Sequence, residues 1–346
     1  MKICVYAIAK NEEQNVEGWY ESAKDADQIV LLDTGSDDDT YDMSRRLGIE
    51  TYRAEIVPWR FDDARNKALS YVSPDIDFCI ALDLDERLLP GWKEAFKEVN
   101  PSTTRIKYRM AYLRDGQKMM WYWANRCHAR HGYHWEYGVH EKPIYNGEEI
   151  VQLLDFDTHH IPDEDKPRNY LEMLEDLTKH FPERERYAIM YARELLFYEH
   201  PIKAHSEFQR YLHIGNPTWQ EYADVYRYMG HCQISPVADF KKSLEYAPRR
   251  ETYIDLAKYY NDRNEWAKCL EYCDKAFAIT EYPTEFTSFL YAWGPLSYSM
   301  ASMAAMNLGE YGLAKHYIDE GLRGGSNERL LNNLKLIQIN EMLSMV

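Results

Sequence analysis

Cysteine is scarce in this chain, and its spacing is irregular. The six cysteines form no CxxC pair and no regular pattern; they are Cys4, Cys79, Cys127, Cys232, Cys269 and Cys273. Such a distribution argues against a disulfide framework. We therefore expect reduced, mostly buried thiols and a cytoplasmic protein.

Long apolar runs and net positive charge are also missing. No apolar run reaches the about 18 residues that a membrane-spanning helix needs, so we expect no membrane span. The apolar run at residues 3–9 is followed at once by Lys10-Asn11-Glu12-Glu13, which favours a first sheet strand over a signal peptide. The formal net charge of −16 disfavours general nucleic-acid binding. One basic stretch, residues 105–130, is suited to a phosphate-bearing small ligand.

The first 160 residues alternate apolar strands with helices. Predicted strands cover residues 3–9, 28–33, 49–54 and 78–82, and predicted helices cover 12–23, 41–47 and 61–71. This alternation predicts a mostly parallel sheet with helices on its faces. Residues 104–146 instead show the polar and apolar alternation of antiparallel strands.

Strand signals vanish from about residue 165, and a helical repeat of about 34 residues begins. The clearest copies are residues 251–280 and 296–323, where small residues stand at the expected helix contacts. The pattern resembles tetratricopeptide repeats, and the alternative is an unrelated helical bundle. With 346 residues, we expect two domains: a Rossmann-like α/β domain at 1–164 and an all-α helical-repeat domain at 165–346.

The acidic stretch Asp83-Leu84-Asp85-Glu86 ends the last of the four predicted strands. In open α/β sheets, ligands bind beyond the carboxyl ends of the strands. Two aspartates at i and i+2 can serve one divalent cation and leave positions for water and phosphate oxygens. The alternative is that these acids cap a helix beginning near Pro90-Gly91-Trp92.

Other candidate site residues have simpler structural alternatives. Asp33 can accept hydrogen bonds from a base or ribose, while the turn after it serves as a helix cap. Arg65 can pair with a diphosphate or with a neighbouring surface carboxylate. His140 and Glu141 offer a metal ligand and a general base. Only one of the adjacent His159 and His160 can face a site, because neighbouring strand side chains point to opposite sides.

Taken in order, these motifs resemble the family 2 glycosyltransferases of GT-A fold, in the subgroup that carries C-terminal tetratricopeptide repeats. The stretches that carry the resemblance are IAKNEE at residues 8–13, VLLDTGSDDDT at 30–40, ARNKAL at 64–69, LDLDE at 82–86 and GVHE at 138–141. The resemblance implies a nucleotide-sugar donor, with uridine diphosphate as the expected carrier, and Mn²⁺ or Mg²⁺. It also implies inversion at the anomeric carbon by a single displacement.

The resemblance also implies roles for individual residues. Asp85 would bind the metal, with His140 or His160 completing its shell. Asp83 would contact the ribose or the waters on the metal. The sequence lacks the later acidic base motif of larger family members, so Glu141 is the candidate base and Glu86 the reserve. The other residues of the nucleotide pocket would be Ala9, Asn11, Glu12, Asp33, Arg65 and Leu84.

The helical repeats suggest how partners bind. Their concave faces would hold an acceptor glycan, peptide or protein, or would mediate a homodimer. One alternative is a non-catalytic scaffold that only binds nucleotide, but the presence of Asp83, Asp85 and Arg65 argues against it. A nucleotidyltransferase would need a glycine-rich and basic phosphate loop after the first strand, and residues 10–13 are not such a loop.

Overall fold

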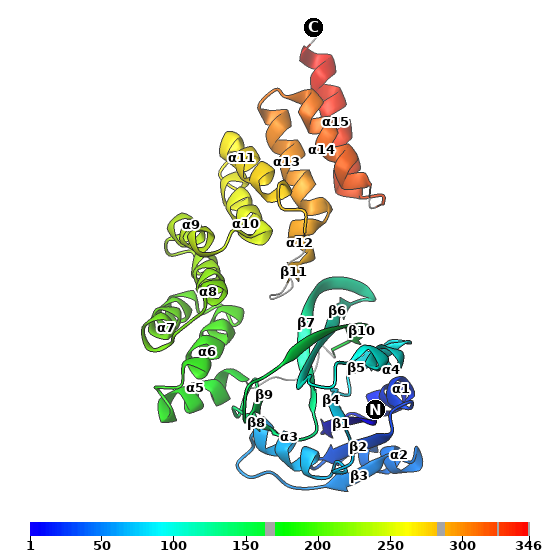
Figure 1. Ribbon diagram of the computed structural model, residues 1–346. Coiled ribbons are helices and arrows are strands. Elements are labelled where there is room, and N and C mark those ends of the chain that lie inside the picture. Colours follow the sequence, from blue (N-terminus) through cyan, green and yellow to red (C-terminus); the bar gives the residue numbers. More distant parts are fainter. Residues whose placement is uncertain (163–169, 282–287, 324, 345–346) are drawn as a thin grey trace. The chain divides into compact units, whose positions relative to one another are not determined.

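A computed structural model describes residues 1–162, 170–281, 288–323 and 325–344 (Figure 1). These residues form two compact units, one up to Met173 and one from Leu174 onward. The boundary predicted between residues 164 and 165 lies outside the described residues.

The first unit is built on one large sheet, whose strands follow the order β3-β2-β1-β4-β7-β6-β10-β5 (Figure 1). β1 pairs in parallel with β2 and β4, β2 with β3, and β6 with β10, while β7 runs antiparallel to β4 and β6. The predicted mostly parallel sheet is therefore confirmed. The strands are β1 (Ile3–Ala9), β2 (Gln28–Asp33), β3 (Glu50–Arg53), β4 (Phe78–Ala81), β5 (Glu86–Leu88), β6 (Arg105–Arg114), β7 (Gln117–Ala129) and β10 (Val151–His160).

Helices cover both faces of this sheet because its central strands are apolar on both sides. On one face, α1 (Glu13–Ala23) buries Val16 and Trp19 against the odd-numbered residues of β1. On the other, α3 (Phe61–Ser70) buries Ala68 and Leu69 in the cluster that contains Tyr6 of β1. The remaining elements are α2 (Thr40–Arg46), α4 (Trp92–Ala95), the short 3-10 helix η1 (Phe96–Glu98) and the hairpin of β8 (Tyr133–Glu136) and β9 (Lys142–Tyr145).

The acidic stretch does not cap a helix, so this alternative is wrong. Helix α4 begins at Trp92, after Gly91 in the left-handed conformation with φ 93°, and no side chain caps it. Glu86 instead opens the short strand β5, which the sequence pattern did not predict and which pairs antiparallel with β10. Because β5 is a strand of the large sheet, this pairing places Glu86 opposite His160 of β10.

The second unit consists mainly of antiparallel helix pairs, which confirms the predicted helical repeats. Close contacts at small residues explain the pairing: a Cβ on Gly230 would come within 2.5 Å of the Phe240 ring. The two-residue strand β11 (Ser288–Phe289) interrupts the helices, so the expectation of no strands here is wrong at that point. The helices are α5 (Tyr170–His180), α6 (Glu185–Phe197), α7 (Pro201–Ile214), α8 (Trp219–His231), α9 (Pro236–Tyr246), α10 (Arg250–Asn261), α11 (Trp266–Phe277), α12 (Leu290–Trp293), α13 (Pro295–Asn307), α14 (Tyr311–Leu322) and α15 (Glu328–Ser344).

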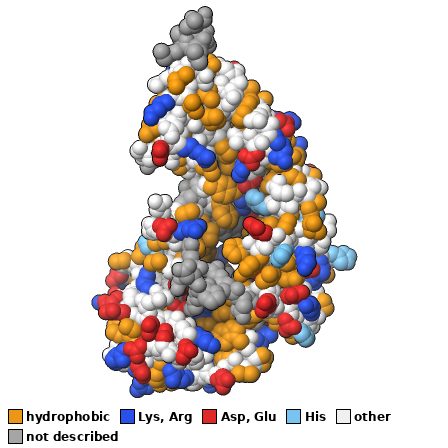
Figure 2. Space-filling model, turned by 180° about the vertical axis from the view of Figure 1, so that it is seen from behind, with side chains coloured by type: hydrophobic (Ala, Val, Ile, Leu, Met, Phe, Trp, Pro, Cys, Tyr) orange, Lys and Arg blue, Asp and Glu red, His pale blue; other side chains and the backbone are white. Residues whose placement is uncertain are grey.

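The state of the cysteines and the distribution of surface charge agree with what the composition predicts. All six cysteines are free and buried, as predicted. Acidic and basic side chains are interspersed over the face drawn in Figure 2, with hydrophobic side chains between them. Among the helices in the described ranges, none is both long enough and apolar enough to span a membrane.

Candidate active site

The loops after β1 and β2 are tied together by polar residues at the carboxyl edge of the sheet. Asn11, in the left-handed conformation with φ 54°, donates its backbone N–H to Ser36 Oγ at 2.9 Å. Its Oδ1 accepts the N–H of Asp37 at 3.0 Å. Glu12 donates its N–H to Thr40 Oγ1 at 2.7 Å. Asn11 and Glu12 therefore build the edge on which a nucleotide pocket is predicted, and the Ala9 carbonyl, which accepts Thr34 N–H at 2.8 Å, anchors it.

Asp33 is fully buried at the end of β2. Its Oδ1 accepts the N–H of Ser36 at 3.0 Å, and its Oδ2 accepts Arg53 Nε at 2.7 Å. The Arg53 guanidinium in turn lies 4.1 Å from the centre of the Tyr41 ring. A carboxylate has about four lone-pair sites, so these two contacts leave Asp33 able to accept further hydrogen bonds.

Five charged side chains of alternating sign surround the end of β4. Arg65 Nη2 donates to Asp83 Oδ1, and Arg65 Nε donates to Glu141 Oε1 at 3.0 Å. Arg126 Nη1 donates to Asp83 Oδ2 at 2.5 Å, while its Nη2 donates to Glu86 Oε1. Glu86 Oε2 also accepts the backbone N–H of Asp83 at 2.9 Å. The resulting network, Glu141–Arg65–Asp83–Arg126–Glu86, fixes the carboxylate of Asp83 from both sides.

Burial and neighbouring charges act differently on the two acids of this network. Burial by itself would raise the pKa of Asp83, but Arg65 and Arg126 hold that pKa well below its usual value. For Glu86, which is 1% exposed, burial dominates and raises the pKa to about 7 against the opposing charge of Arg126. Asp83 is therefore ionised, and its side chain remains 34% exposed toward the solvent.

Asp85 lies beside His160 because β5 pairs with β10. In this pairing, His160 lies opposite Glu86, and Ile161 donates its N–H to the Asp85 carbonyl at 2.8 Å. His160 Nε2 then lies 3.1 Å from Asp85 Oδ2. Burial lowers the pKa of His160, but the hydrogen bond and charge of Asp85 outweigh it and raise the pKa overall. Both side chains are about a quarter exposed, at 27% for Asp85 and 24% for His160.

These residues fit a divalent metal only in part. Across the ranges that the structure describes, no group of three or more His, Cys, Asp or Glu side chains could hold a metal ion. Both oxygens of Asp83 are engaged by arginines, which leaves Asp85 and His160 as the available pair. Two protein ligands suit Mg²⁺ or Mn²⁺ when water and phosphate oxygens supply the rest. His140 is not brought to this pair; its ring contacts Tyr170, and its backbone is left-handed with φ 54°.

The loop that carries Glu141 is held to helix α3. Asn66 Nδ2 donates to the Trp135 carbonyl at 2.8 Å, and Asn66 Oδ1 accepts the Trp135 N–H at 2.8 Å. Phe61 donates its N–H to the Gly138 carbonyl at 3.0 Å. Tyr137, with φ 80°, is also left-handed, so this loop holds two strained residues, a feature common at functional sites.

Sequence reasoning missed the roles of Arg126 and Asn66. Arg126 was recognised only as one member of the basic stretch, because its contact with Asp83 spans 43 residues. The irregular pairing of β6 and β7 between Ile106 and Tyr108 lies next to Arg126. Asn66 belongs to the stretch ARNKAL at residues 64–69. This stretch is the sequence signal that could have indicated a structural role for Asn66. Leu84, predicted to lie in the pocket, is 2% exposed and belongs to the hydrophobic core.

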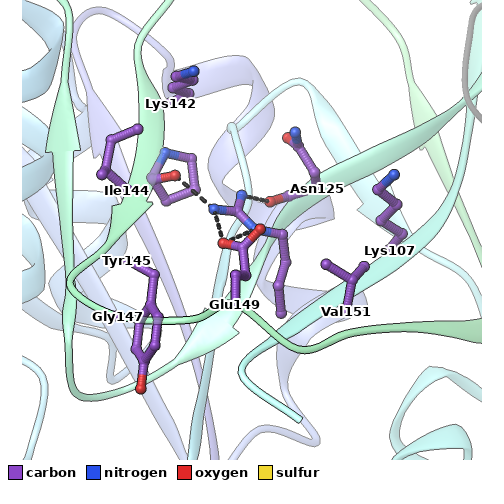
Figure 3. A pocket seen from close by; sticks show the side chains of 10 residues that line it. Lys107, Asn125, Lys142, Ile144, Tyr145, Gly147, Glu149 and Val151 are labelled. Carbon is purple, nitrogen blue, oxygen red and sulfur yellow. Dashed lines mark hydrogen bonds and ion pairs between the residues drawn. The ribbon is translucent and has the colours of Figure 1, made fainter. Parts of the chain in front are cut away.

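A separate shallow pocket of about 470 Å³ contains none of the predicted site residues. Its centre is Arg105, which pairs with Glu149 Oε1 at 2.7 Å and donates to the carbonyls of Asn125 and Pro143 at 2.9 Å and 2.6 Å (Figure 3). Each of the three guanidinium nitrogens of Arg105 is hydrogen-bonded within the protein. No residue that lines this pocket belongs to the acidic network, so the two are distinct.

Comparison with known families finds a match within the first unit. Residues 4–99 match the family model described as "Glycosyl transferase family 2". The resemblance predicted from the motifs is thus confirmed: a region similar to family 2 glycosyltransferases precedes tetratricopeptide-like helical repeats. The match supports glycosyltransferase activity in general, and this family generally uses nucleotide-sugar donors and a divalent metal.

The solved structures similar to this chain include proteins described as TPR proteins. MamA is 13% identical, with a TM-score of 0.37, over 44% of this chain and 85% of that chain. YrrB, described as a TPR protein with an unusual peptide-binding site, is 9% identical, with a TM-score of 0.36, over 48% and 81%. A thermophilic TPR protein of Thermus thermophilus is 13% identical, with a TM-score of 0.35, over 49% and 89%. The repeat assignment itself rests on the helix pairs described above.

Proposed function

We propose that the protein is a metal-dependent, inverting glycosyltransferase. It would move a sugar from a nucleotide-sugar donor to a hydroxyl or thiol of a glycan, protein or other biomolecule. The observation that carries this proposal is the Asp85–His160 pair beside the arginine-held Asp83 at the carboxyl edge of β4. Ligands bind at this edge in open α/β sheets.

The donor side would be formed by the carboxylates at the ends of β2 and β4. Asp33 is fully buried and is held by Arg53 and its own turn, so it would act mainly by positioning Arg53 and this turn beside a uracil base or the ribose. Asp83 is fixed by two arginines and keeps an exposed face for a ribose hydroxyl or for waters on the metal. Arg65 is 3% exposed, so it would act mainly by positioning Asp83 rather than by reaching the diphosphate itself.

Asp85 and His160 would hold Mn²⁺ or Mg²⁺ when it is bound. The ion would offset the negative charge that develops on the leaving diphosphate. His160 must be neutral to act as a ligand, and Asp85 raises its pKa. Metal affinity is therefore expected to fall as the pH drops through the pKa of His160.

Glu141 would be the base on the acceptor side. It would take the proton of the acceptor hydroxyl or thiol while that oxygen or sulfur bonds to the anomeric carbon and the bond to the diphosphate breaks. Arg65 Nε orients its carboxylate through one oxygen. Glu86, the reserve candidate, fits less well because its 2% exposed side chain is held by Arg126 and by the N–H of Asp83.

A thermal-shift panel tests this proposal. Nucleoside diphosphates and nucleotide sugars, including the uridine series, are added to the full chain with and without Mn²⁺. We expect stabilisation by at least one of them that depends on Mn²⁺, together with slow release of the diphosphate from the matching sugar donor. Absence of any metal-dependent stabilisation would contradict the proposal. Binding without turnover of any nucleotide sugar would favour the non-catalytic scaffold.

A further inference from the structure

The hairpin of β6 and β7 extends the first unit beyond the end of β4 (Figure 1). β4 pairs with residues 127–129 of β7, whereas β7 begins at Gln117, so most of β7 lies past the end of β4. Arg126, the first residue beyond this pairing, already belongs to the network around Asp83. The part of the hairpin nearer its turn therefore lies at the same edge of the sheet as the candidate active site.

Two tyrosines of this hairpin share a sheet face with His160. Tyr112 of β6 lies opposite His160 of β10. Met110, two residues before Tyr112, lies opposite Tyr122 of β7. Paired residues, and residues two apart on one strand, project from the same face of a sheet. Tyr112 and Tyr122 are therefore diagonal neighbours, about 7–8 Å apart between Cα atoms, and we call them the tyrosine pair.

Both members of the tyrosine pair lie close to the charged residues of the site. The Tyr112 ring contacts the His160 imidazole edge-on, with 5.4 Å between the ring centres and 88° between their planes. Burial raises the pKa of Tyr122 to about 12 against the opposing charge of Arg126. Three carboxylates add to this increase: those of Glu86, Asp83 and Asp85. The tyrosine pair thus lies beside the Asp85–His160 pair, at the end of the network that carries Glu86.

The hydroxyls of the tyrosine pair are available to a ligand. Both side chains are partly buried, and within the described part of the chain neither hydroxyl makes a hydrogen bond. A tyrosine combines an apolar ring with a polar end, and a buried hydroxyl usually has a partner. The tyrosine pair therefore offers flat apolar surface together with two unused donor and acceptor groups.

A sugar ring has the complementary chemistry. A hexose carries C–H groups on its faces and hydroxyls around its edge, so it can pack on an aromatic ring and hydrogen-bond to a phenol at the same time. In a nucleotide sugar, this ring is bonded to the terminal phosphate of the diphosphate. Asp85 and His160 are the residues that would hold the ion on that diphosphate. Because Tyr112 touches His160, the tyrosine pair lies next to the position of the sugar.

We propose that Tyr112 and Tyr122 bind the sugar ring of the donor, which is a hexose packed on the two aromatic rings and hydrogen-bonded to their hydroxyls. This inference rests on the proposed function and adds the residues that recognise the sugar. Asp33 and Asp83 serve the nucleotide part of the donor, and the tyrosine pair serves the group that is transferred. Glu141, the proposed base, belongs to the opposite end of the network, on the acceptor side.

Calorimetric binding to the full chain in the presence of Mn²⁺ tests the proposal. The ligands are the diphosphates of uridine, guanosine and thymidine, and the esters UDP-glucose, UDP-N-acetylglucosamine, GDP-mannose and dTDP-glucose. Tyr112→Leu/Tyr122→Leu keeps apolar volume without flat rings, and Tyr112→Phe/Tyr122→Phe keeps the rings without their hydroxyls. The matched control is Tyr20→Leu, because Tyr20 of α1 is likewise partly buried.

We expect at least one sugar ester to bind the leucine variant about tenfold more weakly than the wild type, since two aromatic contacts of usual strength are lost. The phenylalanine variant should bind this ester about threefold more weakly, because only hydrogen bonds are lost, and the control should bind it as the wild type does. The matching diphosphate should bind all four proteins with equal affinity, which also shows that each variant is folded.

The outcomes separate this inference from the proposed function. An equal loss for ester and diphosphate, an unchanged ester affinity, or binding of a diphosphate but of no ester would overturn the role of the tyrosine pair. Absence of binding of any diphosphate to the wild type would contradict the proposed function, and this inference with it. If the leucine variant does not fold, the phenylalanine variant decides, and an unchanged ester affinity in that variant overturns the proposal.

Discussion

Removing the guanidinium of Arg126 is expected to destabilise the first unit strongly. In Arg126→Gln, Glu86 loses the cation that holds its Oε1, and Asp83 loses the partner of its Oδ2. Glu86 determines the size of this effect. Its side chain is only 2% exposed, so its carboxylate cannot be hydrated when the cation is removed. Breaking a buried ion pair by removing one partner typically costs about 3–5 kcal/mol. We expect a loss of this order at pH 8, where Glu86 is mostly ionised in the wild type, and where the variant must either protonate Glu86 or leave its charge unpaired.

The pH dependence and a second substitution identify the cause. Burial raises the pKa of Glu86 to about 7, so at pH 5 the carboxyl is protonated and needs no cation. The destabilisation by Arg126→Gln should therefore be smaller at pH 5 than at pH 8. Adding Glu86→Gln removes the stranded charge as well, and the double variant should recover about 2 kcal/mol or more of the loss, because paired residues are not additive.

The assay must report on the first unit alone, because two units can unfold separately. Hydrogen-exchange mass spectrometry of peptides covering β4 and β7, recorded over a urea series, gives the local free energy of unfolding. The matched control is Arg46→Gln, which removes an arginine that is 61% exposed and paired with Asp39. Such surface pairs contribute about 0–1 kcal/mol. A loss in Arg126→Gln no larger than in Arg46→Gln, or strict additivity with Glu86→Gln, would refute the reasoning.

Two further predictions concern the acceptor base and a buried histidine. Glu141→Gln keeps an oxygen for Arg65 but cannot take a proton, so kcat for sugar transfer should fall by about 10²–10⁴ with nucleotide affinity nearly unchanged; wild-type kcat would exclude Glu141 as the base. Burial lowers the pKa of His128 from 6.5 to about 4. Between pH 6.5 and pH 4 this imidazole is therefore protonated in the unfolded chain but not in the folded protein. The stability of the fold should fall as the pH drops through this range. From pH 7 to 5 the wild type should lose about 2 kcal/mol more than His128→Gln in the same exchange assay, and an equal loss in both proteins would contradict the assignment.

Local patterns were enough to locate the acids at the strand ends. The apolar runs before Asp33 and Asp83 each predict a buried strand, and a side chain directly after such a strand must lie at the carboxyl edge of the sheet. The repeat in the second half was visible for a similar reason, since small residues such as Gly230 recur where helices touch. The strand ends and the helix pairs were predictable because they depend on residues that are close together in the sequence.

Features that depend on pairing between distant segments were not predictable in this way. The contact of His160 with Asp85 requires β5 to pair with β10 across 75 residues, and β5 is only three residues long. Arg126 lies where the pairing of two long antiparallel strands is irregular, and its contact with Asp83 spans 43 residues. Residues 288–293 combine the short strand β11 with the helical turn α12, and their contacts with α10 join residues far apart in the chain.

Metal-dependent nucleotide binding by Asp85 is the central claim, and one titration tests it most directly. Mn²⁺ is titrated calorimetrically into the full chain in the presence of uridine diphosphate, for wild type, Asp85→Ala and the control Asp25→Ala, which alters an exposed acid before β2. We expect metal-dependent binding in the wild type and in Asp25→Ala, and its loss in a folded Asp85→Ala protein. Undiminished Mn²⁺ binding by Asp85→Ala would contradict the account.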